Sequence, residues 1–187
     1  MQSCEGVVML FFVLQGNSFY FSHINFLIAL YRNGKSKLVC EKMEFDYPKN
    51  VRFECERCAL CCGDTKNRTR LILLLRIEAE RISRKTLKNV DDFAEKIEGF
   101  EPYVYRMRKT KDGKCIFLKD KLCSIYQIRP LICTFYPFEL KVGSNKYIFA
   151  YTDECPAIGK GLKVTKSYFE RLFKKFIELM NKNAGIT

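Results

Sequence analysis

The sequence predicts a small, cysteine-rich α+β domain with two β-hairpins and a C-terminal amphipathic helix. Three observations predict this fold: an Asp-Gly turn at Asp112-Gly113 between apolar runs, a second pair of strand-like runs around Gly143-Ser144-Asn145, and a helical apolar stripe from Val164 onward. Apolar residues make up 48% of the 187 residues and charged residues 29%, which is typical of one globular domain with its own core.

Residues 1–42 differ in character from the remaining chain. No Lys, Arg, Asp or Glu occurs from Gly6 to Tyr31, yet neither apolar run, 7–14 or 26–31, approaches the ~20 residues that cross a bilayer. No basic residue precedes the first run, as a secretory signal requires. We expect an N-terminal extension that is either not translated, with Met43 as the start, or weakly membrane-associated. We expect residues 43–187 to form a cytoplasmic domain without a membrane span.

The first part of this domain is predicted to be a loop, a strand and two helices. The segment 55–62 ends in the turn Gly63-Asp64-Thr65, which indicates a loop. Residues 71–75 are continuously apolar and predict a short buried strand, followed by a helix over 76–88. A second short helix is predicted over 91–97, with two aspartates in its first turn.

The two hairpins and the last helix follow in order. The runs 103–110 and 114–118 flank the Asp-Gly turn, and the runs 138–142 and 147–151 flank the second turn. From Val164 to Met180, apolar residues recur at helical spacing against Lys and Arg, which predicts a helix with one buried face. Ser167 and Glu170 have the spacing of a capping box, and Gly185 marks the expected end of the helix.

Eight of the ten cysteines lie in this domain, and four of them form a Cys-x-x-Cys-x-x-Cys-Cys cluster. A two-residue spacer lets successive thiolates turn around one ion, which predicts metal ligands in preference to disulfides. The only histidine is His23, so the domain offers no Cys/His zinc finger and no histidine-activated cysteine protease. The candidate metal ligands are Cys55, Cys58, Cys61, Cys62, Cys115, Cys123, Cys133 and Cys155.

Eight thiols permit two sites of four thiolates each. Because neighbouring side chains are expected to diverge, we favour Cys62 serving a different site from Cys61. One hypothetical partition combines Cys155 with the first three cysteines of the cluster, and Cys62 with the other late cysteines. Four thiolates suit zinc and iron–sulfur clusters alike. The three spaced ligands with a distant Cys155-Pro156 are similar to bacterial ferredoxins in ligand order, so a 4Fe-4S cluster is our preferred hypothesis and zinc stays open.

The chain closely resembles the YkgJ-type CxxCxxCC family of zinc- or iron-chelating domains. The residues that carry the resemblance are 53–62, 113–118, 123–138 and Cys155-Pro156, within a matching region of about 43–161. The resemblance implies that all eight cysteines belong to the metal site. Ala59 stands where glycine is common in the family, so the conformation of the first loop is a point of difference.

Arg129-Pro130 and the nearby aromatic residues are candidates for supporting the site. Pro130 ends any helix begun at Ser124, and Arg129 is a candidate donor to a thiolate or a substrate carboxylate. Aromatic residues here are expected to form an apolar wall, namely Tyr126, Phe135 and Tyr136. Two carboxylates, Asp64 and Glu78, are expected at the surface and are not included in the site.

Three classes of function fit the sequence. We favour a metal-binding protein with an electron-transfer or enzyme-accessory role and an unidentified protein partner. The alternative is a zinc-stabilised nucleic-acid-binding module, because the net charge is +12 and basic residues gather around the first hairpin. Those residues are Lys66, Arg68, Arg70, Arg106, Arg108, Lys109, Lys111 and Lys114. The third class is a redox or protein-modifying enzyme that uses the adjacent thiols of Cys61 and Cys62, for which no catalytic set is visible.

Overall fold

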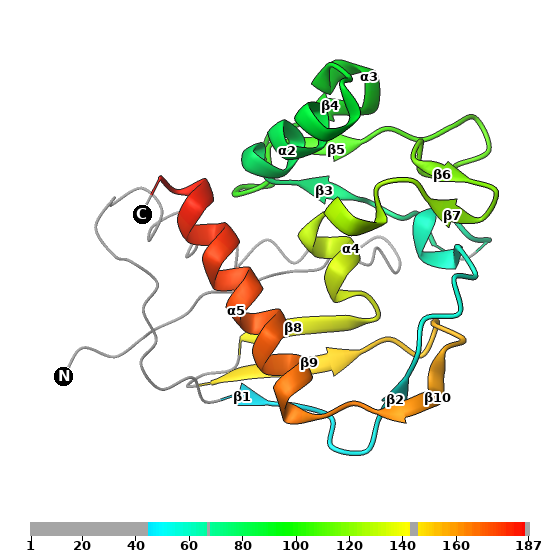
Figure 1. Cartoon of the computed structure of the whole chain (residues 1–187), viewed down its shortest axis with the longest axis vertical. Helices are drawn as coiled ribbons and strands as arrows, with labels where there is room; N and C mark the ends of the chain where they lie inside the picture. The colour runs from blue at the N-terminus through cyan, green and yellow to red at the C-terminus, as the bar shows by residue number, and fades with distance from the viewer. Residues whose placement is uncertain (1–44, 67, 143–145, 186–187) are drawn as a thin grey trace. The chain divides into compact units, whose positions relative to one another are not determined.

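The computed structural model describes residues 45–66, 68–142 and 146–185, which fall into two compact units (Figure 1). The helix–sheet unit comprises residues 45–54 and the described part of 137–185, and the cysteine unit comprises the described part of 55–136. Helices and small sheets occur together, so the α+β class is confirmed. The predicted extension, residues 1–42, lies outside the described residues.

The sheet of the helix–sheet unit contains the second predicted hairpin. Strands β8 (Phe138–Val142) and β9 (Tyr147–Tyr151) pair antiparallel, and β1 (Phe45–Asp46) pairs parallel with β9. The two hairpin strands have the bounds predicted from the two runs that flank Gly143-Ser144-Asn145 in the sequence. A separate pair joins β2 (Arg52–Phe53) to β10 (Ile158–Lys163).

Helix α5 (Lys166–Asn183) packs its apolar stripe on the sheet, as the helical spacing predicted (Figure 1). The ring of Phe169 lies 5.0 Å from that of Phe138 and 4.8 Å from that of Phe149, measured between ring centroids. The predicted capping box is wrong, because Thr165 precedes the first turn and Ser167 lies inside the helix. The helix stops where predicted, and Gly185 adopts a φ of +73° just beyond its end.

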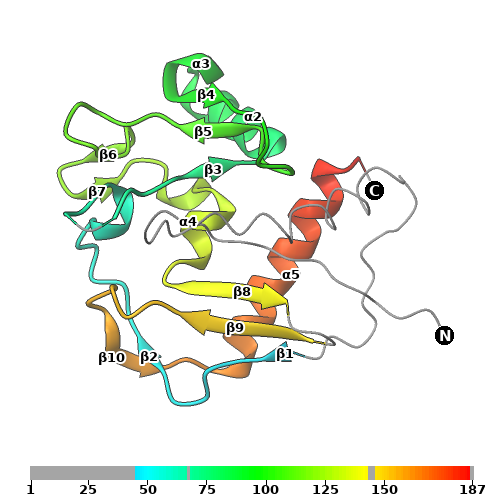
Figure 2. The ribbon, with the colours of Figure 1, turned by 180° about the vertical axis from the view of Figure 1, so that it is seen from behind.

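A three-stranded antiparallel sheet forms the body of the cysteine unit (Figure 2). Its central strand is β5 (Tyr105–Met107), flanked by β3 (Leu73–Leu74) and β4 (Ala94–Lys96). Helix α2 (Arg76–Thr86) follows β3, which confirms a strand followed by a helix in this part of the sequence. No helix among the described residues is long and apolar enough to span a membrane.

The helix predicted over 91–97 is wrong in its second half. The helix α3 (Val90–Phe93) keeps the two aspartates in its first turn, but the chain then becomes strand β4. Ala94 is fully buried, and the Glu95 carboxylate accepts a hydrogen bond from Arg106 Nε on β5 at 2.7 Å. Pairing with β5 therefore overrides the local helical preference.

The first predicted hairpin forms its turn but not its second strand. The N–H of Gly113 donates to the carbonyl of Thr110 at 3.0 Å, and Lys109 forms a single bridge with Cys115. The N–H of Thr110 donates to the carbonyl of Lys114 at 2.8 Å, and the N–H of Ile116 donates to the carbonyl of Arg108 at 3.2 Å. Residues 114–116 therefore pair with residues 108–110 beyond the end of β5 but do not form a regular strand.

A short hairpin that the sequence analysis missed follows this turn. Strands β6 (Leu118–Lys119) and β7 (Leu122–Cys123) are joined by Asp120 and Lys121, which both have positive φ, 48° and 61°. Two such residues in a two-residue loop are the conformation that matches the twist of paired strands. The segment continues through η2 (Tyr126–Ile128) to α4 (Leu131–Phe135).

Candidate metal centre

The first cysteine loop is an irregular segment that ends in one tight helical turn. Residues 55–59 have no regular structure, and η1 (Leu60–Cys62) follows. Ala59 begins this turn with a φ of +63°, the left-handed conformation that glycine adopts without strain. Glycine at the corresponding position of the resembling family is therefore explained by the backbone here.

The backbone joins this loop to the segment that carries Cys115. The N–H of Cys115 donates to the carbonyl of Cys62 at 2.6 Å, and the N–H of Asp64 donates to the carbonyl of Gly113 at 3.0 Å. Gly63 forms a bridge with Lys114 and has no room for a side chain, because a Cβ would lie 2.6 Å from Lys114 Cδ. Two cysteines that are distant in sequence are therefore fixed side by side.

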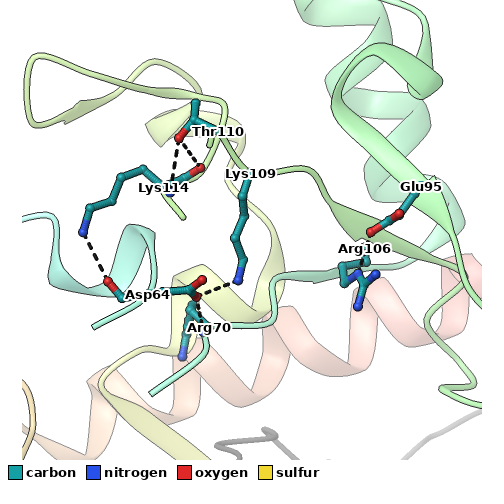
Figure 3. A network of polar contacts seen from close by, with 7 residues as sticks. All are labelled: Asp64, Arg70, Glu95, Arg106, Lys109, Thr110 and Lys114. Carbon is teal, nitrogen blue, oxygen red and sulfur yellow. Dashed lines mark hydrogen bonds and ion pairs between the residues drawn. The ribbon is translucent and has the colours of Figure 1, made fainter. Parts of the chain in front are cut away.

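The side chain of Asp64 adds hydrogen bonds at the contact between the first cysteine loop and the Cys115 segment, which we call the junction (Figure 3). Its Oδ1 accepts hydrogen bonds from Lys109 Nζ at 2.6 Å and from the backbone N–H of Arg70 at 2.7 Å, and Lys114 Nζ donates to its carbonyl oxygen at 3.3 Å. Partial burial raises the pKa of this carboxyl, but the lysines and the backbone donor outweigh burial and lower it. The Asp64 side chain is 33% exposed and at the same time connects three segments of the junction.

The sulfurs of Cys61 and Cys62 lie 3.9 Å apart, so the expected divergence of their side chains is wrong. The tight turn of η1 brings them together. Their hydrogen bond lowers the pKa of Cys61 and raises that of Cys62, because one thiol stabilises the other thiolate. Arg70 and Arg68 lower the pKa of Cys61 further through their positive charges, whereas burial opposes this. The pair therefore releases its first proton easily, as a thiolate ligand must.

Three further thiols come from the later segments of the same unit. Cys115 is buried beside the Asp-Gly turn, Cys123 ends β7, and Cys133 lies in α4. Burial raises the pKa of all three thiols, that of Cys115 to about 11. The negative charge of Cys61 adds to the increase at each of them, which places the five thiols within electrostatic reach of one another. We call this set the thiol cluster; its members are Cys61, Cys62, Cys115, Cys123 and Cys133.

The remaining three predicted ligands lie elsewhere. Cys55 and Cys58 are exposed in the irregular loop of the cysteine unit. Cys155 belongs to the helix–sheet unit, where it is buried and its carbonyl accepts the N–H of Ile158 at 3.0 Å. Among the described residues, no three cysteine, histidine or carboxylate side chains are grouped closely enough to hold a metal ion. The chemistry of the thiol cluster nevertheless fits a thiophilic metal, because its five candidate donors are all sulfur atoms of free cysteines.

Glu78 is a structural residue that the sequence analysis assigned wrongly to the surface. Its side chain is fully buried, and it accepts the backbone N–H of Leu75 at 3.1 Å and that of Leu131 at 2.6 Å. Arg81 Nη2 lies 3.8 Å from the same carboxylate and donates to the carbonyl of Ile128 at 3.3 Å. Glu78 thus connects the start of α2 to the start of α4, which carries Cys133. Its place three residues into a helix start was the available signal.

Arg129 and the aromatic residues are only partly where we expected them. The guanidinium of Arg129 lies 4.0 Å from the ring centroid of Tyr126, donates to the carbonyl of that tyrosine, and lowers the pKa of Cys123 against the larger effect of burial. Tyr126 is 38% exposed, so it forms no buried wall. Phe135 is fully buried, whereas the ring of Tyr136 lies against the guanidinium groups of Arg68 and Arg70.

The basic residues proposed for nucleic acid do not form one exposed surface. Arg68 and Arg70 are only 4% exposed, and Lys109 is paired with Asp64. Arg106 is paired with Glu95 across the sheet. The two buried arginines therefore cannot belong to an exposed basic surface that binds nucleic acid.

Comparisons with known proteins give one family and one relative. A family model described as "CxxCxxCC: Putative zinc- or iron-chelating domain" matches residues 54–156, which contain all eight candidate ligands. An uncharacterized protein, MJ0661, of Methanocaldococcus jannaschii is 27% identical over 152 residues, covering 78% of this chain and 78% of that protein. No solved structure gives a significant match.

Proposed function

Because the chain belongs to the CxxCxxCC family of zinc- or iron-chelating domains, we propose that it binds its metal with the thiol cluster, helped by the exposed cysteines of the first loop. The observation that supports this most is the 3.9 Å separation of the Cys61 and Cys62 sulfurs, in a unit where three further thiols are within electrostatic reach. Five thiols without a cation would be a costly arrangement once they are deprotonated. A bound metal neutralises them and stabilises the fold.

Some of the candidate ligand cysteines are held in place by the fold, and others lie in a loop without regular structure. Cys62 and Cys115 are held by the backbone bond between them, and Cys123 and Cys133 are held in β7 and α4. Cys55 and Cys58 lie in an irregular, exposed loop that can adjust to an ion. We propose that this loop closes on the metal.

Our preferred metal group is a 4Fe-4S cluster, and zinc is the alternative. The support is the Cys-x-x-Cys-x-x-Cys order with a distant Cys-Pro, which is the ligand order of bacterial ferredoxins. When bound, a 4Fe-4S cluster would supply one-electron transfer, whereas a zinc ion would only stabilise the fold. An electron-transfer or enzyme-accessory role follows from the first choice.

Anaerobic purification of the full chain, followed by metal analysis and a visible spectrum, tests this function. Iron and sulfide in stoichiometric amount with a brown colour would support the cluster, and zinc in a colourless protein would support the alternative. Protein that takes up neither metal after anaerobic reconstitution would contradict metal binding by this chain.

A thiol redox protein is a second candidate, favoured by the same pair of sulfurs. Because its pKa is lowered, the Cys61 thiol is suited to attack a disulfide substrate. Cys61 and Cys62 would then form a disulfide with each other, and their two electrons and two protons would pass to the substrate, whose two sulfurs become thiols. Metal-free protein that reduces a model disulfide stoichiometrically, and loses this activity in Cys61→Ser, would support this candidate over a metal centre.

A further inference from the structure

Arg70 is a buried cation with an unusual environment. Its side chain is only 4% exposed, and it lies between the loop that follows η1 and strand β3 (Figure 3). Asp64 contacts the backbone N–H of Arg70, while the ion pair recorded for the Asp64 carboxylate is with Lys109. The nearest carboxylate in sequence is thus already engaged.

The guanidinium itself lacks an acceptor. Within the described residues, Nε and Nη2 of Arg70 are buried without a hydrogen-bond partner. Buried charged groups are costly unless they are paired, so such atoms in a folded protein point to an anion that completes the site. The ring of Tyr136, with its centroid 4.9 Å from Arg70 Cζ, offsets part of this cost.

A second buried arginine lies against the same tyrosine ring. Arg68 is also 4% exposed, and its Cζ lies 5.7 Å from the centroid of the same ring. Two guanidinium groups at one tyrosine repel each other in a region of low dielectric. Both act electrostatically on Cys61, and Arg70 also acts on Cys133.

We propose that Arg70, with Arg68 beside it, is the counter-charge of the thiolate–metal centre, and that its buried N–H groups donate to the thiolate sulfurs when the metal is bound. This inference rests on the proposed function. Four thiolates around one divalent cation leave a net charge of about −2, which two guanidinium groups neutralise. The arginines are positioning residues, because they act through the sulfurs and do not ligate the metal.

The test measures the affinity of the full chain for Zn²⁺ by competition with a chromophoric chelator under anaerobic conditions. Arg70→Gln should bind Zn²⁺ about tenfold to a hundredfold more weakly than the parent, the usual loss when a group that supports a metal ligand is removed. Arg70→Lys should lie between them, because it keeps the charge but not the planar donor pair. The difference should persist at high salt, since a buried charge is little screened.

Arg106→Gln is the matched control, because Arg106 belongs to the same unit but its ion pair with Glu95 is 43% and 39% exposed. It should keep the parent affinity. If Arg70→Gln keeps it too, the inference is overturned, whereas a parent that binds no metal overturns the proposed function instead. Should Arg70→Gln fail to fold, Arg68→Gln replaces it, and parent affinity in that variant overturns the inference. Stoichiometric binding of inorganic phosphate to the metal-loaded parent, lost in Arg70→Gln with metal affinity unchanged, would also overturn it in favour of an oxyanion site.

Discussion

The backbone N–H of Cys115 donates to the carbonyl of Cys62 at 2.6 Å, and this single bond joins the early cysteine cluster to the first of the late cysteines. Asp64 and Gly113 support it with a second backbone bond at 3.0 Å. Backbone groups form both of these bonds, so the relative position of Cys62 and Cys115 does not depend on their side chains. The predictions below test the ligands, this junction and the elements that hold them.

Replacing Cys58 by Ser should lower the metal content and the melting temperature together. The binding free energy of structural zinc in small peptides is ~10–16 kcal/mol, comparable with the whole stability of a domain, so a weakened site should destabilise the fold. Metal stoichiometry and melting temperature of anaerobically purified protein measure both effects. Cys4→Ser and Cys40→Ser are the controls, since neither cysteine belongs to the candidate set. Parent values for Cys58→Ser would show that the first loop is not a ligand loop.

Replacing Gly113 by Ala should destabilise the junction. Gly113 has a φ of +75°, and an added Cβ would lie 2.9 Å from Asp64 Oδ2. Gly99→Ala is a matched control, because Gly99 has a φ of +79° and nothing within 4 Å of the added Cβ. Alanine in the left-handed conformation costs ~1 kcal/mol of stability in both variants. Gly113→Ala should lose a further ~1–2 kcal/mol, because its Cβ clashes with Asp64. Urea denaturation of the metal-free protein compares them, and equal midpoints would mean that the junction is not tightly packed.

Replacing Glu78 by Gln should destabilise the cysteine unit by roughly 1.5–3 kcal/mol, the typical contribution of a hydrogen bond to a charged group. The neutral amide cannot accept the N–H groups of Leu75 and Leu131 as strongly as the buried carboxylate does. Glu80→Gln, two residues further along α2, loses only an exposed ion pair with Arg76 and should change stability by less than about 0.5 kcal/mol. Denaturant midpoints measure the difference. The same small change in both variants would show that Glu78 does not hold α4 in place.

Replacing Ala59 by Gly should stabilise the metal-free protein slightly. The left-handed backbone at φ +63° costs alanine ~1–2 kcal/mol, and the greater freedom of glycine in the unfolded chain cancels ~0.4–1 kcal/mol of the gain. Ala79→Gly should have the opposite sign, because Ala79 lies fully buried inside α2. Thermal unfolding of the two variants gives the comparison, and destabilisation by Ala59→Gly would contradict the backbone conformation of the first loop.

The elements that local pattern controls were predicted well. The two strand-like runs at 138–142 and 147–151 predicted both strands of the β8/β9 hairpin, and the helical stripe from Val164 predicted α5, because these signals are local in the sequence. Strand β4 and the β6/β7 hairpin were missed. In β4 the pairing with the next strand, β5, overrides the local helical pattern, and in the hairpin the turn residues Asp120 and Lys121 are not the usual Asn-Gly or Asp-Gly pair.

The family was readable from the sequence alone, because the regularly spaced cysteines that define it lie close together in the chain, and the assignment of the eight cysteines as ligands stays a prediction. Only the tertiary structure decided which charges are buried. Arg68, Arg70 and Glu78 are surface-like in sequence, yet each is almost or fully buried, because a segment distant in the chain covers it. Burial and electrostatic contact depend on how distant segments pack, and no local pattern of residues records that packing.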